Sequence, residues 1–454
     1  MENIKEQNPL GYAPVKSLFW KLSIPAVLAQ VINLLYNLVD RIFIGHIKDV
    51  GEYALTGVGI CFPIIIIISA FACLCGMGGA PKAAIKMGEG DNKSASKILG
   101  NCTSLTIISA IVLTIIFQIF KEPFLYAFGA SDNTIEYALD YINIYSIGTI
   151  FVMITLGLNA FITTQGFSRV SMINVVIGAL LNIILDPIFI YGFKMGVEGA
   201  ALATIISQAF SAFLVLRFLL SKKSKLELTL GNMKLDIKII LSVVALGLSP
   251  FIMQSTESII SICFNTSLLK YGGDIAVGTM TILSSLMQFA MFPLQGFAQG
   301  AQPIISFNYG AKKPKRIKEV FKLLLIICIS FSFAFWLIVM LFSTPLMKIF
   351  TSNPELIVFA SRAVKIYMAV ICLFGIQIAC QQTFVSLGNA PVSLFLAIFR
   401  KIILLIPLIY IVPLLMENKC DAVFLAEPIA DFVAVSTTAI MFAIIFKKAM
   451  KKIS

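Results

Sequence analysis

Charged residues are scarce in this 454-residue chain. Only 13% of the residues are charged, against about 25% in a typical soluble globular protein, and 59% are hydrophobic. A chain this apolar is not suited to fold as a water-soluble domain. Apolar runs near or above the roughly 18 residues that identify a membrane-spanning helix recur along its whole length, and the alternating pattern of a membrane β-barrel strand is absent. The composition therefore predicts an all-α polytopic membrane protein.

The residues on which many enzymes depend are also scarce. The chain has a single histidine, His46, and no Gly-x-x-x-x-Gly-Lys-Ser/Thr loop to hold nucleotide phosphates. Its nine cysteines lie mostly inside apolar runs, a distribution that favours neither disulfides nor a zinc site. We therefore expect that the protein is not an enzyme and has no cofactor. No motif supports a membrane enzyme such as a lipid-linked transferase.

The net charge of +12 does not indicate a nucleic-acid partner, because the basic residues are spread over short loops between apolar runs. Most of the 35 Lys and Arg residues lie at the amino end, in the carboxyl tail and near 79–97, 157–170, 217–238 and 310–322. Cytoplasmic loops of membrane proteins carry such an excess of Lys and Arg. We therefore expect a protein of the cell membrane with both termini in the cytoplasm.

The hydropathy pattern predicts twelve spans in two halves. The expected spans are 17–45, 53–78, 94–119, 135–156, 160–192, 197–220, 237–268, 275–300, 318–342, 358–384, 391–415 and 421–446. The basic segment 221–238 is the predicted linker, so we expect an amino-terminal lobe over 1–220 and a carboxy-terminal lobe over 239–454.

The two halves repeat one another in the residues that set kinks and turns. Gly78, for example, has its counterpart 222 residues further on, in Gly300. At the same offset Gly51, Pro81, Gly88, Pro123 and Gly166 fall on Gly273, Pro303, Gly310, Pro345 and Gly388. This pattern predicts parallel six-helix repeats, related by an axis along the membrane normal. Two such lobes with a cleft between them suit transport by alternating access.

Polar side chains at membrane depth gather in the first half. Asn33, Tyr36, Asn37 and Asp40 form one stripe on the first span, and Asn182 lies one turn before Asp186 on the fifth. The sixth span adds Thr204 and Gln208. Pro187 cannot donate a backbone hydrogen bond, so we expect the fifth span to be loosened beside Asp186. This set of oxygen-bearing groups suits a proton or a hard cation such as Na⁺.

Each of these residues also has a purely structural interpretation. Asp186 could cap or pair near the end of a span, and Asp40 has Arg41 as its neighbour. Asn33 and Asn37 could equally join helices to one another. Ionisable residues inside a membrane are costly and usually functional, which favours a functional role for both carboxylates.

The second half has fewer such groups. Gln254, Glu257 and Asn265 line one face of the seventh span and form a possible second polar site. Met287, Gln288 and Gln377, together with Asn33 and Asn37, are candidates for a substrate cavity. Methionine-rich surfaces adapt to varied ligands, although a Met and Phe stripe more often faces lipid or core.

Several motifs resemble the multidrug and toxic compound extrusion (MATE) family of cation-coupled antiporters. The segment 296–311 (GFAQGAQPIISFNYGA) resembles a signature of that family closely. Further similar segments are 36–45 (YNLVDRIFIG), 181–187 (LNIILDP), 199–204 (GAALAT) and 426–431 (AEPIAD). The resemblance covers essentially the whole chain, in the order of the family.

The resemblance implies two six-helix lobes in a V around a central cavity, which export organic cations and other drugs in exchange for H⁺ or Na⁺. It places the coupling ion among Tyr36, Asp40, Asn182, Asp186 and Thr204. The last four are possible ligands of Na⁺. Some relatives use a second pair of acids, in the seventh and tenth spans. Glu257 matches the first, but Phe374 stands near the place of the other.

A lipid-linked oligosaccharide flippase of related architecture is the alternative. Such proteins tend to carry more cationic side chains in the cavity, whereas the only deep cations here are Arg400 and Lys401. The acidic stripe of the first span favours a cationic substrate. We therefore expect a monomeric drug exporter whose partners are small organic cations and the lipid bilayer. A receptor role is less favoured because no extramembrane domain is evident. The coupling ion, H⁺ or Na⁺, stays open.

Overall fold

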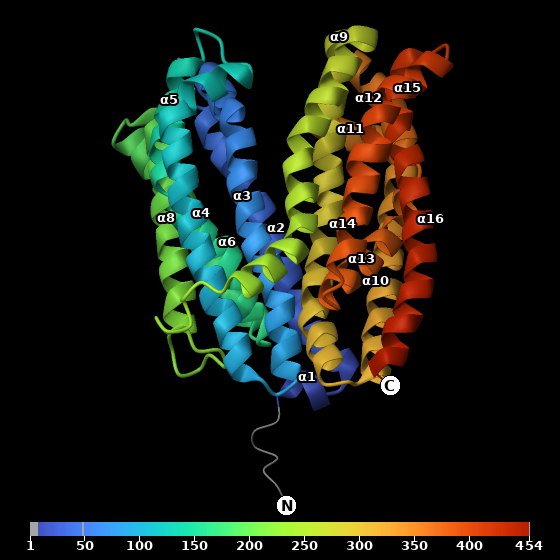
Figure 1. Cartoon of the computed structure of the whole chain (residues 1–454). Helices are drawn as coiled ribbons and strands as arrows, with labels where there is room; N and C mark the ends of the chain where they lie inside the picture. Colours follow the sequence, from blue (N-terminus) through green and yellow to red (C-terminus); the bar gives the residue numbers. More distant parts are fainter. Residues whose placement is uncertain (1–7, 48–49, 454) are drawn as a thin grey trace, which may run out of the picture.

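The computed structural model describes residues 8–47 and 50–453, except for the side chain of residue 52, and all regular structure in this part is helical. The predicted start of the amino-terminal lobe at 1–7 and the final residue lie outside the described residues. The helices form two bundles, which lie close together at the end that carries both termini and diverge toward the other end (Figure 1). The predicted V-shaped, all-α architecture is confirmed.

The first bundle begins with the short helix α1 (Pro9–Tyr12). Its spans are α2 (Val15–Gly45), α3 (Gly51–Gly88), α4 (Asn92–Ala127), α5 with α6 (Ile135–Ile147 and Thr149–Thr164), α7 with the π-helix η2 (Ser168–Pro187 and Ile188–Gly192) and α8 (Gly196–Leu219). Helices α5 and α6 bend by 56° but cross as one span.

The second bundle follows the same plan. Its elements are α9 (Ile237–Gly310), α10 (Pro314–Leu341), the short α11 (Ser343–Phe350), α12 with η3 and α13 (Pro354–Tyr367, Ile371–Leu373 and Phe374–Ser386), α14 with the π-helix η4 and α15 (Ala390–Ile398, Phe399–Leu405 and Ile406–Leu415) and α16 (Lys419–Ile453). Helices α12 and α13 bend by 44°.

Helix α9 crosses the membrane twice. Its 74 residues would measure about 110 Å if straight, far more than one crossing requires. The chain reverses at Gly273, whose φ of +63° suits a residue without a side chain. Within the described residues, nine single helices and two bent pairs are long and apolar enough to span a membrane. Because α9 is one of the nine and crosses twice, the total is the predicted twelve spans.

Several predicted boundaries were wrong. The fourth span was expected to end at 156 and the fifth to begin at 160, but α6 continues to Thr164 and the turn falls at Gln165–Phe167. Gly166, with a φ of +94°, makes that turn, while Gly157 stays helical against the backbone of Ala72. Helices α3 and α9 also run past their expected ends, to Gly88 and Gly310. Their last turns pack on one another rather than ending at the hydrocarbon boundary.

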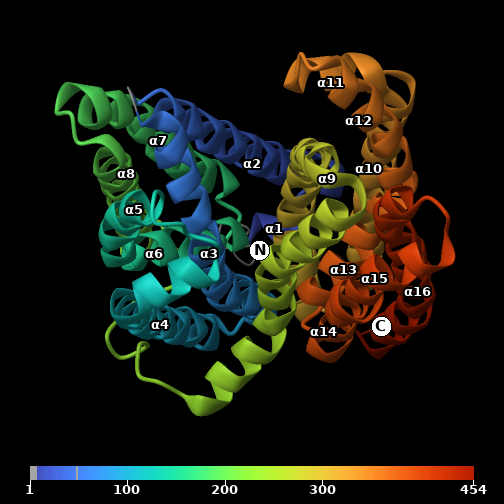
Figure 2. The same ribbon diagram turned by 90° about the horizontal axis from the view of Figure 1, so that it is seen from above.

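The repeated glycines lie where the two bundles meet. A Cβ atom on Gly88 would lie 2.0 Å from the carbonyl oxygen of Phe307, and one on Gly310 would lie 1.9 Å from that of Ile85. Because the two glycines are counterparts in the repeat, each half contributes the same small residue to the contact. The absence of side chains lets the two backbones approach closely, and α3 and α9 lie side by side where the bundles meet (Figure 2).

Candidate functional site

Polar groups from α7 and α8 meet inside the first bundle. The amide Nδ2 of Asn182 donates to Asp186 Oδ1 at 3.1 Å and lies 3.3 Å from Thr204 Oγ1. The Asp186 side chain is fully buried and that of Asn182 nearly so. The one-turn spacing of Asn182 and Asp186 therefore places both side chains on one face of α7, as the sequence predicted, and Asn182 reaches α8 through Thr204.

The end of α7 is distorted beside Asp186. The α-helix ends at Pro187, and the chain continues as the π-helix η2, in which the amide of Phe193 donates to the carbonyl of Ile188. Proline removes a backbone donor, and π-helical turns occur frequently at functional sites. The hydroxyl of Tyr191 in η2 donates to the carbonyl oxygen of Phe43 in α2 at 2.7 Å. The distorted segment is therefore tied to the helix that carries Asp40.

Asp40 from α2 completes the cluster. Its carboxyl group lies within hydrogen-bonding reach of Asp186. Asp40 Oδ1, Asp186 Oδ2 and Asn182 Oδ1 are buried and have no hydrogen-bond donor among the described residues. The neighbouring guanidinium of Arg41 lies 5.1 Å from the ring centroid of Phe62, and no ion pair joins it to Asp40 in the described part of the chain. We call Asp40, Asn182, Asp186 and Thr204 the amino-lobe cluster.

Two carboxyl groups in contact cannot both stay ionised without a proton or a cation nearby. The amino-lobe cluster offers carboxylate, amide and hydroxyl oxygens, which suit H⁺ or a hard cation. Among the described residues no three His, Cys, Asp or Glu side chains converge as a metal-binding group. Oxygen donors of this kind are typical of sites for hard ions rather than for transition metals.

The stripe on α2 has divided roles. Tyr36 interacts electrostatically with both Asp40 and Asp186, so it belongs beside the cluster. The side chain of Asn37 instead donates to the carbonyl of Asn33, at 2.7 Å and within the same helix. Asn37 therefore bonds within its own helix and does not join two helices through this hydrogen bond.

The second bundle buries a network of opposite charges. Arg400 in η4 donates to Asp431 at 2.7 Å and to Glu427 at 3.0 Å, both on α16. Lys401, the next residue, donates to Glu257 on α9 at 2.5 Å. The guanidinium of Arg400 also lies 4.6 Å from the ring centroid of Phe374, at the position where some relatives were expected to place an acid. We call these five charged residues the carboxyl-lobe network.

The structure corrects the interpretation of several candidates in the second half. Glu257 pairs with Lys401, and no hydrogen bond of the described residues joins it to Gln254 or Asn265. The Gln377 side chain is only 2% exposed and donates to Gln381, so it belongs to the core rather than to a cavity wall. Gln288 is exposed, and Met287 is half-buried against the core.

Sequence reasoning missed the carboxyl-lobe network as a unit. It placed Arg400 and Lys401 in the eleventh span without assigning partners to them. A cation inside an apolar run must find an anion or a polar cavity, and Glu427 and Asp431 were the acids that lay inside the twelfth span rather than at its end. That requirement was a usable signal for the pairing.

The sequence of this chain is similar to a known protein family and to named relatives. The MatE family model matches the chain twice, over residues 25–188 and 250–411, once in each half. The multidrug export protein MepA of Staphylococcus haemolyticus (strain JCSC1435) is 26% identical over 419 residues, covering 91% of this chain and 90% of that protein. MepA of Staphylococcus aureus (strain NCTC 8325 / PS 47) is 25% identical over 410 residues, covering 88% and 87%.

Solved structures share the fold. A crystal structure of MATE in the bent conformation matches with a TM-score of 0.90 and 23% identity, over 97% of each chain. An outward-facing multidrug resistance MATE family transporter of the MOP superfamily matches with a TM-score of 0.90 and 23% identity, over 99% of this chain and 100% of that chain.

Proposed function

The chain belongs to the MatE family of multi-pass membrane transporters, and from that premise we propose that it exports organic cations from the cell in exchange for inward flow of H⁺ or Na⁺. The relatives reported above are named multidrug export proteins. Their names favour drug export over the alternative of a lipid-linked oligosaccharide flippase.

The amino-lobe cluster carries the proposal for ion coupling. Asp40 and Asp186 come from different helices, lie close enough to interact electrostatically and keep buried oxygens without donors. A proton or Na⁺ that binds between them would cancel their repulsion and let α2 and α7 approach. Loss of the ion would push the two helices apart. Because η2 is tied to α2 through Tyr191, the change would be passed to the distorted end of α7.

Alternating access supplies the remainder of the mechanism. In the arrangement described here the two bundles meet at the end that carries the termini and diverge at the other (Figure 1). An ion that enters from the open end would neutralise the cluster, the organic cation would leave, and the bundles would then rock. A ligand can drive this change only through different affinities for the two arrangements.

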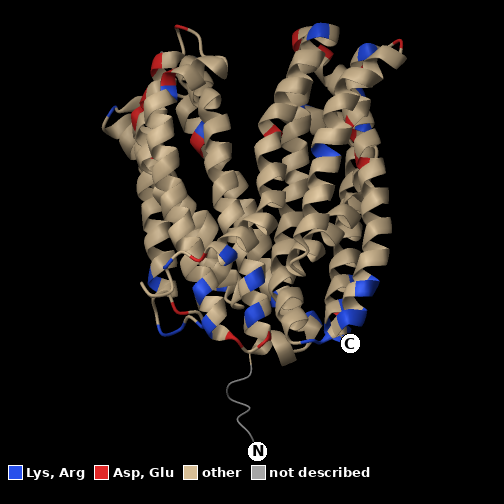
Figure 3. Cartoon of the chain, in the orientation of Figure 1, with Lys and Arg blue, Asp and Glu red and all other residues tan. Residues whose placement is uncertain are grey.

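The distribution of charge supports a cytoplasmic position for both termini. Lys and Arg residues gather at the end where the bundles meet and the termini lie (Figure 3). The structure would then be open to the outside, which is the side where a drug is released and the coupling ion is taken up. We further propose that one chain suffices for this cycle, since each half supplies one bundle.

Everted membrane vesicles test the proposal directly. The uptake of a fluorescent organic cation is measured with a pH gradient and with a Na⁺ gradient, each imposed alone. We expect one of the gradients to drive uptake by the wild type, which identifies the ion. We expect Asp186→Asn to reduce this uptake to the background of vesicles without the protein, because a neutral amide cannot carry a proton and lacks the negative charge that attracts Na⁺.

Asp274→Asn is the matched control, since Asp274 is an exposed carboxylate near the turn of α9. It removes the same charge and should leave uptake unchanged. Membrane insertion of both variants is checked by quantifying purified, folded protein. Wild-type uptake by Asp186→Asn, under either gradient, would contradict the role of the cluster in coupling.

A further inference from the structure

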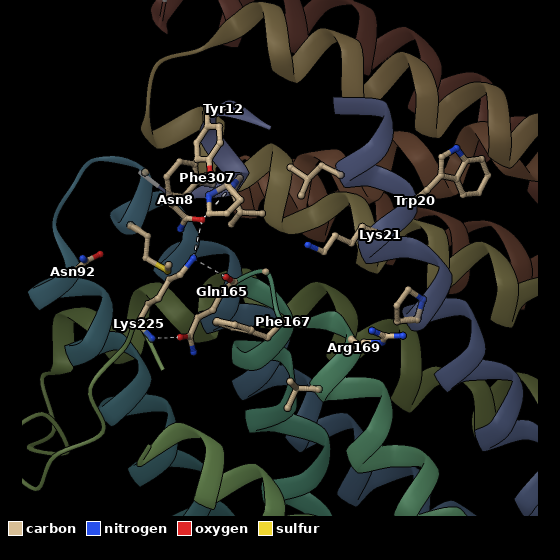
Figure 4. Close-up of a pocket in the computed structure, with 18 of the residues that line it drawn as sticks. Asn8, Tyr12, Trp20, Lys21, Asn92, Gln165, Phe167, Arg169, Lys225 and Phe307 are labelled. Carbon is tan, nitrogen blue, oxygen red and sulfur yellow. Dashed lines mark hydrogen bonds between the residues drawn. The ribbon is translucent and has the colours of Figure 1, made fainter. Parts of the chain in front are cut away.

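A cavity of about 1360 Å³ lies at the end of the molecule that carries the termini. It is bordered by α1, the first turns of α2 and α7, the linker between α8 and α9, and the end of α9 (Figure 4). Three cationic side chains line it: Lys21 from α2, Arg169 from α7 and Lys225 from the linker. No Asp or Glu is among the described residues that line it. The cavity therefore has a charge of one sign only.

None of the three cations takes part in an ion pair within the described part of the chain. The ammonium of Lys225 donates to Asn8 Oδ1 at 3.0 Å and to the carbonyl oxygen of Gln165 at 3.4 Å, and it lies 5.5 Å from the ring centroid of Phe167. These partners are all neutral. Burial lowers the pKa of Lys225, a cost that a nearby anion would offset.

Neutral polar groups line the cavity around Lys225, and apolar side chains line it around the other two cations. Asn8, Asn92 and Gln165 accompany Lys225, whereas Ile24 and Val170 stand beside Lys21 and Arg169 on α2 and α7. Ile24 lines the cavity and is 49% exposed, so it offers apolar surface beside these two cations. A ligand with a charged head and apolar chains would satisfy both kinds of lining.

We propose that this cavity binds a phosphate-bearing anion, held by Lys21, Arg169 and Lys225, and that its main source is an anionic phospholipid of the surrounding leaflet. Arg169 offers a planar fork that fits two phosphate oxygens, while the two lysines act as point charges. Basic pockets between membrane helices on the cytoplasmic side suit anionic lipid headgroups. Free phosphate is the other source of the same chemistry, but it would leave the apolar side chains unused.

Occupation of the cavity should favour the arrangement in which this end is closed. Helix α1 is held by the second bundle, because Lys313 donates to the carbonyl of Gly11 and Arg316 donates to that of Ala13. Lys225 and Gln165 face α1 from the side of the first bundle. If the bundles parted here, the walls of the cavity would separate. A ligand that binds the closed walls better therefore stabilises them.

The tryptophans of the chain provide the test. Trp20 lines the cavity and Trp336 lies in α10, and the chain has no other tryptophan. The full-length Trp336→Phe variant is reconstituted into vesicles that contain phosphatidylcholine and phosphatidylglycerol, with brominated chains on one lipid or the other. Brominated phosphatidylglycerol should quench Trp20 more strongly than brominated phosphatidylcholine. The Trp20→Phe variant, which reports on Trp336, should show no preference.

Two further variants separate the cavity from general surface charge. Adding Lys21→Gln, Arg169→Gln and Lys225→Gln to the Trp336→Phe variant should abolish the headgroup preference. Adding Lys97→Gln, Lys222→Gln and Lys223→Gln, which remove three exposed charges that do not line the cavity, should preserve it. Equal loss of the preference in both sets would show that surface charge alone recruits the lipid, and would overturn the proposal.

Inorganic phosphate forms the other arm of the test. If it raises the melting temperature of the detergent-solubilised protein, but not that of the variant lacking the three cavity cations, the anion site stands. The absence of any headgroup preference would then assign the site to free phosphate. If neither the lipid preference nor the phosphate shift depends on these three residues, the cavity does not bind phosphate-bearing anions. A variant that starts at residue 8 controls for competition by Glu2 and Glu6.

Discussion

The two bundles share a scaffold but differ in whether their buried charges are neutralised by other side chains. The amino-lobe cluster places Asp40 close to Asp186, and no ion pair of the described residues neutralises either. The carboxyl-lobe network surrounds its acids with two cations, Arg400 and Lys401. The amino-lobe cluster needs a cation from outside the chain to neutralise its carboxylates. The carboxyl-lobe network contains two cations of its own for three carboxylates. An exchangeable ion is therefore expected in the first bundle.

This difference separates stability from function. A buried carboxylate without a partner destabilises the fold, so replacing it with an amide should cost little. A buried cation that neutralises two carboxylates is different, because its removal leaves their charges uncompensated. Substitutions in the amino lobe should therefore impair transport in a folded protein, and those in the carboxyl lobe should impair folding.

The largest effect on stability is expected at Arg400. Arg400→Gln leaves Glu427 and Asp431 buried without their cation, and should lower the free energy of unfolding by about 3–5 kcal/mol. Denaturant titration of the purified protein in detergent measures the loss. Adding Glu427→Gln and Asp431→Asn should recover most of it. A loss as large for Asp186→Asn as for Arg400→Gln would remove the contrast between the lobes.

A smaller effect is expected where the repeated glycines meet. Gly88→Ala and Gly310→Ala each place a methyl group against the backbone of the opposite half, and overpacking of this kind costs about 1–3 kcal/mol. Because the two positions are related by the repeat, the two variants should have melting temperatures that are lowered by similar amounts. Gly59→Ala, at a helical glycine of α3 with open space around it, is the control and should not destabilise the protein. Strongly unequal effects of the two substitutions would show that the halves do not share the contact evenly.

Effects no larger than these are expected at the pair formed by Glu257 and Lys401, where the two substitutions should differ. The side chain of Glu257 is 54% exposed and that of Lys401 is 6% exposed. Lys401→Met leaves a carboxylate that water can still solvate, so the loss of stability should stay within about 1 kcal/mol. Glu257→Gln leaves a buried ammonium without its anion and should cost more, roughly 1–3 kcal/mol. The reverse order would mean that Glu257 is the solvent-shielded partner.

Much of the fold could be predicted from the sequence. Twelve apolar runs predicted the twelve spans, and Gly273 falls in the predicted gap between the seventh and eighth. The boundary between the fourth and fifth spans was wrong because α6 continues through Gly157, which packs on α3, and the turn falls at Gly166. Hydropathy alone does not distinguish a glycine that allows close packing from one that makes a turn.

The candidate site was predictable where its residues lie on one helix. Asn182 and Asp186 are one turn apart, and this spacing alone places them on one face of α7. The contact with Asp40 followed only from resemblance to a family, because no local pattern relates two separate helices. Gln377 was misread for the same reason: a glutamine in an apolar helix can face the core or a cavity, and the neighbouring helices decide between them.

The sequence by itself determined that this is a membrane protein of two repeated halves, with a carboxylate and an amide at membrane depth in the first. Hydrophobic length and helical period act locally, so they can be read along the chain. Only the tertiary structure decided which charges are neutralised. Arg400 meets Glu427 and Asp431 because the π-helix η4 and the packing of α16 bring these side chains together. The rotation of one helix against another depends on contacts across the whole bundle, and no local pattern records it.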